Sequence, residues 1–211
     1  MSYRFLLVDD HSIVRRGLRD LLAEEFAGAE FGEAASGPEA LALVARQPWS
    51  LMVLDVSIPG RDGLDVLEEV HALHPQTRVL VLSGHDEEQY AMRALRAGAS
   101  GYVSKDTAPD ELCRAVHKVL AGGRYVSSAL AEKLADQLAR PGERAPHELL
   151  SNREMQVLKL LARGRSVKDI GAELSLSEKT ISTYRTRILE KMNLKSNAEL
   201  MRYALKTGLV D

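Results

Sequence analysis

The segment Leu51–Asp55 (LMVLD) is the feature that most restricts what this chain can fold into. Four consecutive apolar residues followed by an acid are typical of a short strand that is buried on both faces of a parallel sheet. Pro59 and Gly60 follow and indicate a turn. Because open α/β sheets bind ligands at the carboxyl ends of their strands, Asp55 is a candidate site residue. A turn-forming or helix-capping aspartate is the alternative interpretation.

The first 120 residues alternate five times between a short apolar run and an amphipathic segment. The apolar runs predict strands at residues 4–8, 30–34, 51–55, 78–82 and 101–103. The amphipathic segments predict helices at residues 12–25, 37–46, 63–73, 87–97 and 109–120. This alternation favours an α/β domain with a doubly wound parallel sheet and right-handed crossovers.

The composition is that of an ordinary globular protein, and 211 residues suffice for one large or two small domains. No apolar stretch approaches the ~20 residues that a membrane helix requires, so we expect a cytoplasmic protein with no membrane partner. The single cysteine, Cys113, excludes an internal disulfide and a thiolate zinc cluster. We expect Cys113 to be packed on a helix.

The net charge of −2 conceals a difference between the two parts of the chain. Residues 150–211 have twelve Lys/Arg against seven Asp/Glu, a net charge of +5. The remainder has sixteen against twenty-three, a net charge of −7. An acidic first part and a basic second part indicate two domains with different partners, and the second partner could be nucleic acid.

Polar side chains follow four of the five predicted strands. Asp9 and Asp10 end the first strand, Asp55 the third and Ser83 the fourth, and Lys105 trails the fifth. We expect these residues to converge at the carboxyl edge of the sheet. Three carboxylates repel one another there unless a cation lies between them, and Mg²⁺ prefers oxygen ligands of this kind. A carboxylate nucleophile beside Mg²⁺, with a lysine and a hydroxyl for phosphoryl oxygens, predicts a phosphoryl-acceptor site. Each residue alone also fits a structural role in a loop or turn.

Four motifs in this part resemble the receiver domain of bacterial two-component response regulators. They are VDD at 8–10, LDVSIPGRDG at 54–63, LSG at 82–84 and YVSK at 102–105. The resemblance covers about residues 1–122 and implies a flavodoxin-like fold with strand order 2-1-3-4-5. It also implies that Asp55 accepts a phosphoryl group from the phosphohistidine of a sensor histidine kinase.

The same resemblance implies roles for the surrounding residues. Mg²⁺ would be bound by Asp10, Asp55 and the backbone carbonyl of Ser57, with Asp9 acting through water. Ser83 and Lys105 would hold the phosphoryl group.

Ser83 and Tyr102 would form the switch that responds to phosphorylation. Because Ser57 and His85 would lie beside the phosphoryl group, we expect both to affect the lifetime of the phosphoaspartate; an ordinary loop histidine is the alternative interpretation of His85. Asp106 stands where many receivers have a proline, so we expect the turn after Lys105 to differ in geometry.

Two features separate the receiver-like part from the rest of the chain. Residues 128–139 have helical apolar spacing, with leucines at 130, 134 and 138. Residues 140–148 (RPGERAPHE) contain two prolines and a glycine and indicate a linker. The predicted organisation is therefore a receiver domain at 1–122, a helical segment and linker at 123–148, and a second domain at 149–211.

The second domain is predicted to contain four short helices, each of which starts at a serine. The starts are Ser151, Ser166, Ser177 and Ser196. The helices end near residues 162, 174, 192 and 207. Only two residues separate the second helix from the third, which predicts a helix-turn-helix.

The third of these helices has two different faces. Its apolar side consists of Ile181, Ile188, Leu189 and Met192. Its polar side combines hydroxyl and basic residues, which suits a helix in the DNA major groove. A solvated face of a four-helix module is the alternative interpretation.

The sequence of 149–211 resembles the four-helix DNA-binding domain of the nitrate-regulator (NarL/FixJ, LuxR-type helix-turn-helix) family. By that resemblance the candidate base-reading residues are Ser182, Thr183 and Thr186. The candidate phosphate contacts are Lys168, Lys179, Thr180, Tyr184, Arg185 and Arg187. Position 185 is usually apolar in that family, so Arg185 either reaches a phosphate or loosens the edge of the core.

Together these features predict an α/β receiver domain followed by an all-α DNA-binding domain, in a transcription factor switched by phosphorylation. The expected partners are a sensor histidine kinase, a second copy of the phosphorylated chain and inverted or tandem half-sites on double-stranded DNA. RNA polymerase is a further candidate partner.

Two alternatives remain open from the sequence. One is a phosphohydrolase that forms an aspartyl-phosphate, although Ser57 stands where such enzymes usually carry a second aspartate. The other is a transcription factor without phosphate control. In the preferred interpretation the chain is not an enzyme, beyond the formation and loss of its own phosphoaspartate.

Overall fold

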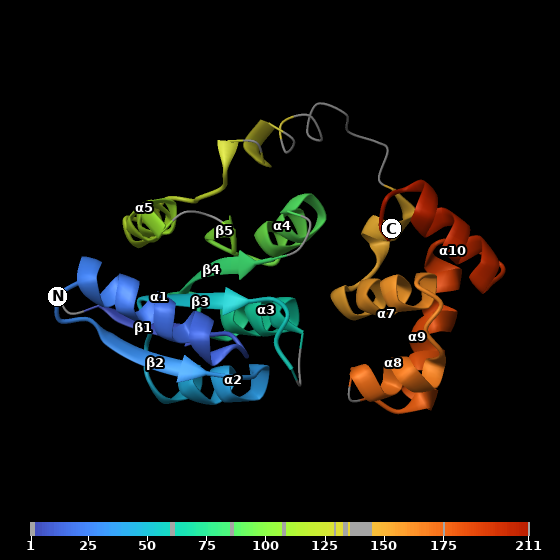
Figure 1. Ribbon diagram of the computed structural model, residues 1–211, viewed down its shortest axis with the longest axis horizontal. Helices are drawn as coiled ribbons and strands as arrows, with labels where there is room; N and C mark the ends of the chain where they lie inside the picture. Colours follow the sequence, from blue (N-terminus) through green and yellow to red (C-terminus); the bar gives the residue numbers. More distant parts are fainter. Residues whose placement is uncertain are drawn as a thin grey trace. The chain divides into compact units, whose positions relative to one another are not determined.

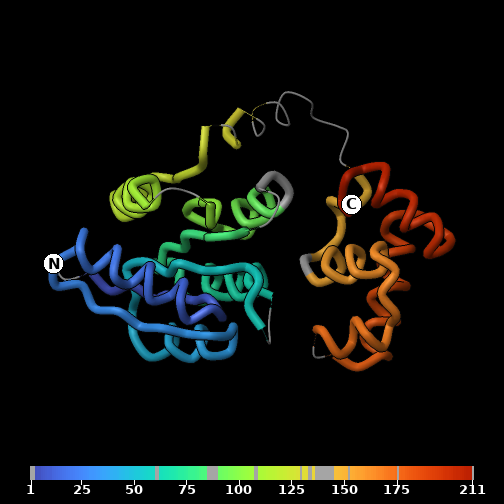
Figure 2. The backbone as a smooth tube through the Cα atoms, in the orientation of Figure 1, coloured from blue at the N-terminus to red at the C-terminus, as the bar shows by residue number. Residues whose placement is uncertain are grey.

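The computed structural model describes residues 3–59, 62–84, 87–106, 109–128, 130–132, 135, 145–174 and 176–210. Contacts within the chain divide it into two compact units, residues 1–139 and 140–211. Figure 2 traces the chain from one unit to the other. The first unit is α/β and the second is all-α, as the sequence predicts.

Five parallel strands form the sheet of the first unit. They are β1 (Arg4–Val8), β2 (Glu30–Ala34), β3 (Leu51–Asp55), β4 (Arg78–Ser83) and β5 (Gly101–Ser104). Their order is β2-β1-β3-β4-β5, which Figure 1 shows from bottom to top. The predicted doubly wound fold and strand order are therefore confirmed. Strand β3 lies in the centre of the sheet, and all five of its residues are buried.

Five helices cover the two faces of the sheet. They are α1 (Ser12–Glu25), α2 (Gly37–Arg46), α3 (Gly63–Leu73), α4 (Glu87–Arg96) and α5 (Pro109–Leu120). Alternate strand residues enter two separate cores because successive side chains point to opposite faces. Met52 and Leu54 pack with α2, α3 and α4, whereas Leu51 and Val53 pack with α1 and α5.

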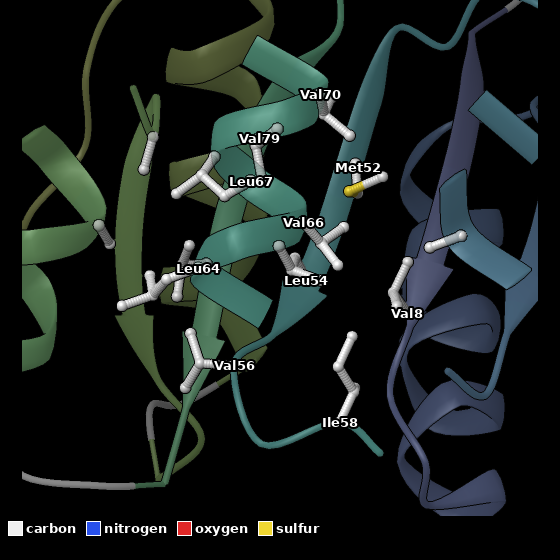
Figure 3. Close-up of a cluster of buried hydrophobic side chains, with 14 of the residues drawn as sticks. Val8, Met52, Leu54, Val56, Ile58, Leu64, Val66, Leu67, Val70 and Val79 are labelled. Carbon is white, nitrogen blue, oxygen red and sulfur yellow. The ribbon is translucent and has the colours of Figure 1, made fainter. Parts of the chain in front are cut away.

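Helix α3 packs against the sheet within the first of these cores. Figure 3 shows Leu64 and Leu67 of α3 beside Leu54 and Val79 of the sheet. These side chains are at most 2% exposed. Each contributes about 1.5–3 kcal/mol through burial of apolar surface. The packing of α3 therefore fixes the segment that connects β3 to it.

Gly63 allows α3 to begin very close to the end of β3. A Cβ atom at this position would lie 2.6 Å from the carbonyl oxygen of Asp55 and 2.5 Å from Cα of Val56. Asp62 caps the helix, since its side chain accepts a hydrogen bond of 2.8 Å from the backbone N–H of Leu64. The close approach holds the backbone at Asp55 against α3.

After α5 the chain returns along the outer side of β5, and we call residues 124–126 the edge segment. Tyr125 forms a parallel bridge with Gly101, and its backbone N–H donates to the carbonyl of Ser100 at 3.1 Å. Its carbonyl accepts from the backbone N–H of Tyr102 at 2.9 Å. Burial and the hydrogen bond to Glu111 raise the pKa of Tyr125 to about 12, so its hydroxyl remains a donor.

The helix expected over 128–139 lies partly outside the described residues, Leu134 and Leu138 among them. Leu130 is described and is 2% exposed, in the same core as Met52 and Leu54. Cys113 is a free, half-buried cysteine on α5. Burial, reinforced by nearby acidic side chains, raises the pKa of its thiol.

The second unit begins with a short 3-10 helix, η1 (Pro146–Leu149), within the region predicted to be a linker. His147 of η1 is buried, and its Nδ1 lies 2.7 Å from the hydroxyl of Tyr203. Four helices follow: α7 (Asn152–Ala162), α8 (Val167–Glu173), α9 (Glu178–Lys191) and α10 (Asn197–Lys206).

Each of the four helices begins after a serine, as predicted. The hydroxyl oxygens of Ser151, Ser166, Ser177 and Ser196 accept from the backbone N–H three residues later. Such caps stabilise a helix by about 1 kcal/mol each.

The turn between α8 and α9 depends on Gly171. A Cβ atom there would lie 2.8 Å from the carbonyl oxygen of Leu176, whose backbone N–H donates to the carbonyl of Gly171. The helix-turn-helix is therefore closed by direct backbone contact. None of the described helices in either unit is both long and apolar enough to cross a membrane.

Candidate functional site

The carboxyl edge of the sheet brings two buried carboxylates together. Strand β1 ends at Val8 and pairs with β3 in a register that places Val8 opposite Leu54. Asp9 and Asp55 therefore leave neighbouring strands at the same level. The side chains of both are 1% exposed. Two carboxylates in such a position require cationic partners, because unpaired buried charges are very unfavourable.

Lys105 supplies one of these partners. Its Nζ lies 2.7 Å from Asp9 Oδ2 and 2.8 Å from Asp55 Oδ2. Burial alone lowers the pKa of Lys105, but the hydrogen bonds and charges of the two aspartates outweigh it and raise the pKa. The backbone N–H of Lys105 donates to the carbonyl of Ser83 at 2.9 Å, which ties the lysine to β4. A lysine whose charged form is favoured therefore contacts both carboxylates.

Asp10 and His11 complete the cluster on the exposed side. Single ligand atoms of Asp9, Asp10, His11 and Asp55 all lie within 4.8 Å of one another. His11 Nδ1 lies 2.8 Å from Asp10 Oδ1 and 3.1 Å from Asp9 Oδ1. The carboxylate oxygens are donors that a hard divalent ion such as Mg²⁺ prefers, so the residues fit a metal site. His11 was not among the site residues expected from the sequence, although its position directly after Asp9 and Asp10 indicates that it lies at the same edge of the sheet.

Arg15 holds the loop that carries this acid pair and was also missed from the sequence. Its Nη1 donates to the carbonyl oxygen of Asp9 at 2.6 Å, and its Nε to Glu33 Oε2 at 3.3 Å. Glu33 belongs to β2, so Arg15 joins α1, the loop and the neighbouring strand. It thereby fixes the backbone from which Asp9 and Asp10 project.

The remaining residues expected at this edge lie on the strand ends and the loops after them. The backbone N–H of Ser57 donates to Asp55 Oδ1 at 3.0 Å. Ser83 is fully buried at the end of β4, one residue past the partner of Asp55 in the sheet register. Tyr102 is 2% exposed on β5. His85 lies outside the described residues.

Asp106, where many receivers have a proline, forms a hydrogen bond through its backbone within the turn after β5. Its backbone N–H donates to Ser104 Oγ at 3.3 Å. Proline has no N–H and could not form this bond.

In the second unit, α9 presents the polar face that the sequence predicts. Lys179, Ser182, Thr183, Thr186 and Arg187 are exposed, whereas Ile181, Ile188 and Met192 are buried. Leu189 and Tyr184 are half-buried and pack against the core. Lys168 is exposed on α8. The cationic and hydroxyl side chains are thus available to a ligand of this unit.

Two threonine hydroxyls of α9 use their hydrogens within the helix. Thr183 Oγ1 donates to the carbonyl of Lys179 at 2.9 Å, and Thr186 Oγ1 to that of Ser182 at 3.1 Å. Their oxygen lone pairs and methyl groups remain for intermolecular contact. In the major groove these groups suit the amino groups of adenine and cytosine and the methyl group of thymine.

Arg185 and Thr180 are both engaged within the unit. Arg185 is half-buried, and its Nε donates to Asn197 Oδ1 at 2.6 Å, which joins α9 to the start of α10. Thr180 Oγ1 lies 2.7 Å from the capping hydroxyl of Ser177. The half-buried arginine therefore joins two helices.

Glu154 fixes the far end of α9 against α7. Its carboxylate accepts from the backbone N–H of Ser151 and from Lys191 Nζ, both at 2.7 Å. Burial favours a higher pKa for Glu154, but the bonds from Lys191 and Ser151 outweigh it and lower the pKa. The buried, ionised glutamate therefore joins the start of one helix to the end of another.

Residues 5–117 match the family described as "Response regulator receiver domain", and residues 148–204 match "Bacterial regulatory proteins, luxR family". The chain belongs to the response regulator family. The regulator is a two-component response regulator with a LuxR-type DNA-binding domain and not a catalytic enzyme, which excludes the phosphohydrolase alternative.

Curated relatives match the regulator over nearly its whole length. Response regulator GacA of Pseudomonas protegens is 35% identical over 208 residues, 99% of this chain and 98% of the relative. Response regulator UvrY of Escherichia coli K12 is 34% identical over 206 residues, 97% of this chain and 94% of the relative.

Solved structures match part or nearly all of the regulator. A LuxR-family two-component response regulator from Aurantimonas is 35% identical with a TM-score of 0.61 and covers 66% of the regulator and 100% of that chain. Response regulator ChrA of a heme-sensing two-component system is 29% identical with a TM-score of 0.52 and covers 99% of both chains. An RcsB–DNA complex shares the fold with a TM-score of 0.60. It is 24% identical and covers 96% of the regulator and 98% of that chain.

Proposed function

We propose that Mg²⁺-dependent phosphorylation of Asp55 by a sensor histidine kinase switches the regulator, which then binds DNA as a dimer. The observation that carries this proposal is the paired, buried state of Asp55 at the carboxyl end of the central strand. A carboxylate at this position is held in place, is screened from water and has a cation beside it. These are the properties that a phosphoacceptor requires.

In the proposed reaction a carboxylate oxygen of Asp55 forms a bond to phosphorus. The P–N bond of the kinase phosphohistidine breaks, and its electron pair stays on the imidazole nitrogen, which then takes up a proton. Lys105 exchanges a carboxylate partner for a phosphoryl oxygen and so compensates the added charge. The Ser57 N–H continues to orient Asp55 through Oδ1.

The acidic cluster of Asp9, Asp10 and Asp55 supports the proposal of a metal ion in this pocket. We assign Asp10, Asp55 and the backbone carbonyl of Ser57 as ligands, with Asp9 acting through water. The ion would supply positive charge for the phosphoryl oxygens during transfer.

A phosphoryl group adds about two negative charges at the end of β3. We assign Ser83 to bind one of its oxygens and Tyr102 to change position with it, because both lie on the adjoining strands β4 and β5. The resulting change in the surface formed by β4, β5 and their helices would favour dimerisation.

For DNA, we assign α9 to the major groove. Ser182, Thr183 and Thr186 would contact base edges. The phosphate contacts would be Lys168, Lys179, Thr180, Tyr184, Arg185 and Arg187. One module of this size buries little surface, so tight binding requires two copies on inverted or tandem half-sites. RNA polymerase at a neighbouring promoter is a further proposed partner, and cytoplasmic location follows from the DNA target.

We propose residues 1–122 as the receiver domain, 123–148 as the connecting segment and 149–211 as the DNA-binding domain. The hydrogen bonds of Tyr125 to β5 indicate that the connecting segment begins in contact with the receiver.

The test compares wild type with Asp55→Asn, and with Asp20→Asn as a control because the Asp20 side chain is 74% exposed. Acetyl phosphate and Mg²⁺ should shift wild type and Asp20→Asn on a phosphate-affinity gel, but not Asp55→Asn. Binding-site selection on random DNA, with and without beryllofluoride, should return paired half-sites that are enriched when beryllofluoride is present. Uptake of phosphate by Asp55→Asn, or selection unaffected by beryllofluoride, would contradict the proposal.

A further inference from the structure

Within the described acidic cluster, His11 is the one residue that offers a nitrogen atom as a metal ligand. Its backbone N–H donates to Asp9 Oδ1 at 2.8 Å, so the residue is anchored to the loop through its main chain. Its ring Nδ1 lies between two carboxylate oxygens, 2.8 Å from Asp10 Oδ1 and 3.1 Å from Asp9 Oδ1. In these contacts Nδ1–H is the donor and the carboxylate oxygens accept, so the imidazole is turned toward the oxygens that a cation would bind.

The spacing of these atoms matches that of neighbouring ligands on a small divalent ion. Bonds of about 2.1 Å at right angles place two adjacent ligand atoms about 3 Å apart. The two distances from Nδ1 bracket this value. Lys105 occupies the Oδ2 atoms of Asp9 and Asp55, whereas His11 faces Asp9 Oδ1. The lysine and the imidazole thus take different oxygens of the same carboxylate.

We propose that His11 is a nitrogen ligand of this pocket and allows the same site that binds Mg²⁺ to bind Mn²⁺, Co²⁺ and Ni²⁺ through nitrogen as well as oxygen. The inference rests on the proposed function, which places a metal ion among the same aspartates. Imidazole suits borderline ions, whereas Mg²⁺ gains little from nitrogen. Coordination through Nδ1 replaces the hydrogen that Nδ1 directs at these carboxylates, so the metal-bound ring would carry its hydrogen on Nε2. The pocket thereby discriminates between metals through a residue that the phosphoryl transfer does not require.

Pulsed electron paramagnetic resonance of the Mn²⁺-loaded full chain tests the contact directly, because a bonded ¹⁴N nucleus modulates the signal. The variants are His11→Asn, Asp10→Asn and His117→Asn. His117 is the matched control, since its exposed ring pairs with Glu25 Oε1 at 2.6 Å on the α5 side of the sheet. Wild type and His117→Asn should show nitrogen coupling, and His11→Asn should bind Mn²⁺ without it.

Isothermal titration calorimetry with MgCl₂ and NiCl₂ gives a second measurement. His11→Asn should weaken Ni²⁺ binding by about tenfold or more, since loss of even an outer-shell partner has an effect of that size. Its Mg²⁺ affinity should change by less than about threefold. Asp10→Asn should weaken both.

The outcomes separate this inference from the function on which it rests. Mn²⁺ and Mg²⁺ binding that requires Asp10 but lacks nitrogen coupling overturns the role of His11 alone. Equal losses of Mg²⁺ and Ni²⁺ affinity in His11→Asn also overturn it, because they indicate a role in loop structure. Mg²⁺ binding that is absent, or unchanged in Asp10→Asn, overturns the proposed metal site itself.

Discussion

Lys105 Nζ lies 2.8 Å from Asp55 Oδ2, so the proposed phosphoacceptor is already paired with a lysine before any phosphate arrives. The same ammonium group bonds Asp9 at 2.7 Å. Without the lysine, the two buried carboxylates would repel each other. A divalent ion bound between them would supply the missing positive charge.

Lys105→Met should therefore destabilise the first unit in the absence of divalent ions, and Mg²⁺ should restore part of the loss. We expect a loss of about 1–3 kcal/mol, less than for a fully buried pair because Lys105 is partly exposed. Urea denaturation with and without Mg²⁺ measures it. Arg16→Met on α1 is the control, because the Arg16 side chain is 86% exposed. A loss of stability that Mg²⁺ leaves unchanged would show that the lysine does not substitute for the metal.

Glu154→Gln should destabilise the second unit near neutral pH by about 1–2 kcal/mol, because Lys191 loses its charged partner. The pKa of Glu154 is lowered from its ordinary value of 4.5, so ionisation stabilises the folded state above that pH. This contribution is lost as pH falls through the lowered pKa. The difference between variant and wild type should therefore shrink in acid.

Denaturation of both proteins at pH 7 and below pH 4 measures this effect. Glu199→Gln is a matched control, since Glu199 also lies three residues after a capping serine, and its carboxylate accepts from the backbone N–H of Lys195. A difference between Glu154→Gln and wild type that does not vary with pH would assign the effect to packing instead of charge.

Alanine substitution at two helical glycines should have opposite effects. Gly171→Ala places a Cβ atom 2.8 Å from the carbonyl oxygen of Leu176 and should destabilise the helix-turn-helix by about 1–3 kcal/mol. Gly17 lies inside α1 with nothing within 4 Å of its Cβ position, so Gly17→Ala should stabilise by about 0.5–1 kcal/mol. Thermal unfolding reports both signs. Destabilisation by both substitutions would mean that the space around the Cβ atom does not decide their effects.

Arg187→Gln should weaken DNA binding by a similar factor on every sequence, because Arg187 is proposed to bind phosphate. The slope of log K against log salt concentration should fall by about 0.9 for each phosphate that the variant no longer neutralises. Fluorescence anisotropy at several salt concentrations measures this slope. Lys206→Gln, an exposed residue in the last turn of α10, is the control. An unchanged slope in Arg187→Gln would remove this residue from the interface.

The fold could be predicted because its signals are local. The apolar run at 51–54 and the acid after it indicate a central strand and its end, and four serines mark the helix starts of the second unit. The convergence of Asp9, Asp55 and Lys105 could be predicted as well, because each follows the carboxyl end of a parallel strand. Parallel strands end at the same edge of the sheet, so the direction of the strands is sufficient to predict that these side chains meet.

Contacts that depend on loop geometry could not be predicted. The ring of His11 contacts the Asp9 carboxylate and the guanidinium of Arg15 contacts the Asp9 carbonyl, and both contacts depend on how the chain passes from β1 into α1. Arg185 was expected at phosphate or at a loosened core edge, and its bond to Asn197 depends on where α10 begins. Tyr125 belongs to a single bridge, which is too short to leave a periodic pattern.

The edge segment at Tyr125 affects how the receiver can be isolated. A fragment cut after residue 122 would retain every proposed catalytic and metal-binding residue, yet it would lose the backbone partners of Ser100 and Tyr102. The outer side of β5 would then expose unpaired backbone N–H and C=O groups, and exposed sheet edges of this kind promote aggregation. A fragment that continues past Leu130 would keep Tyr125 paired with this strand edge. It would also keep the Leu130 side chain, which is 2% exposed, in the apolar core.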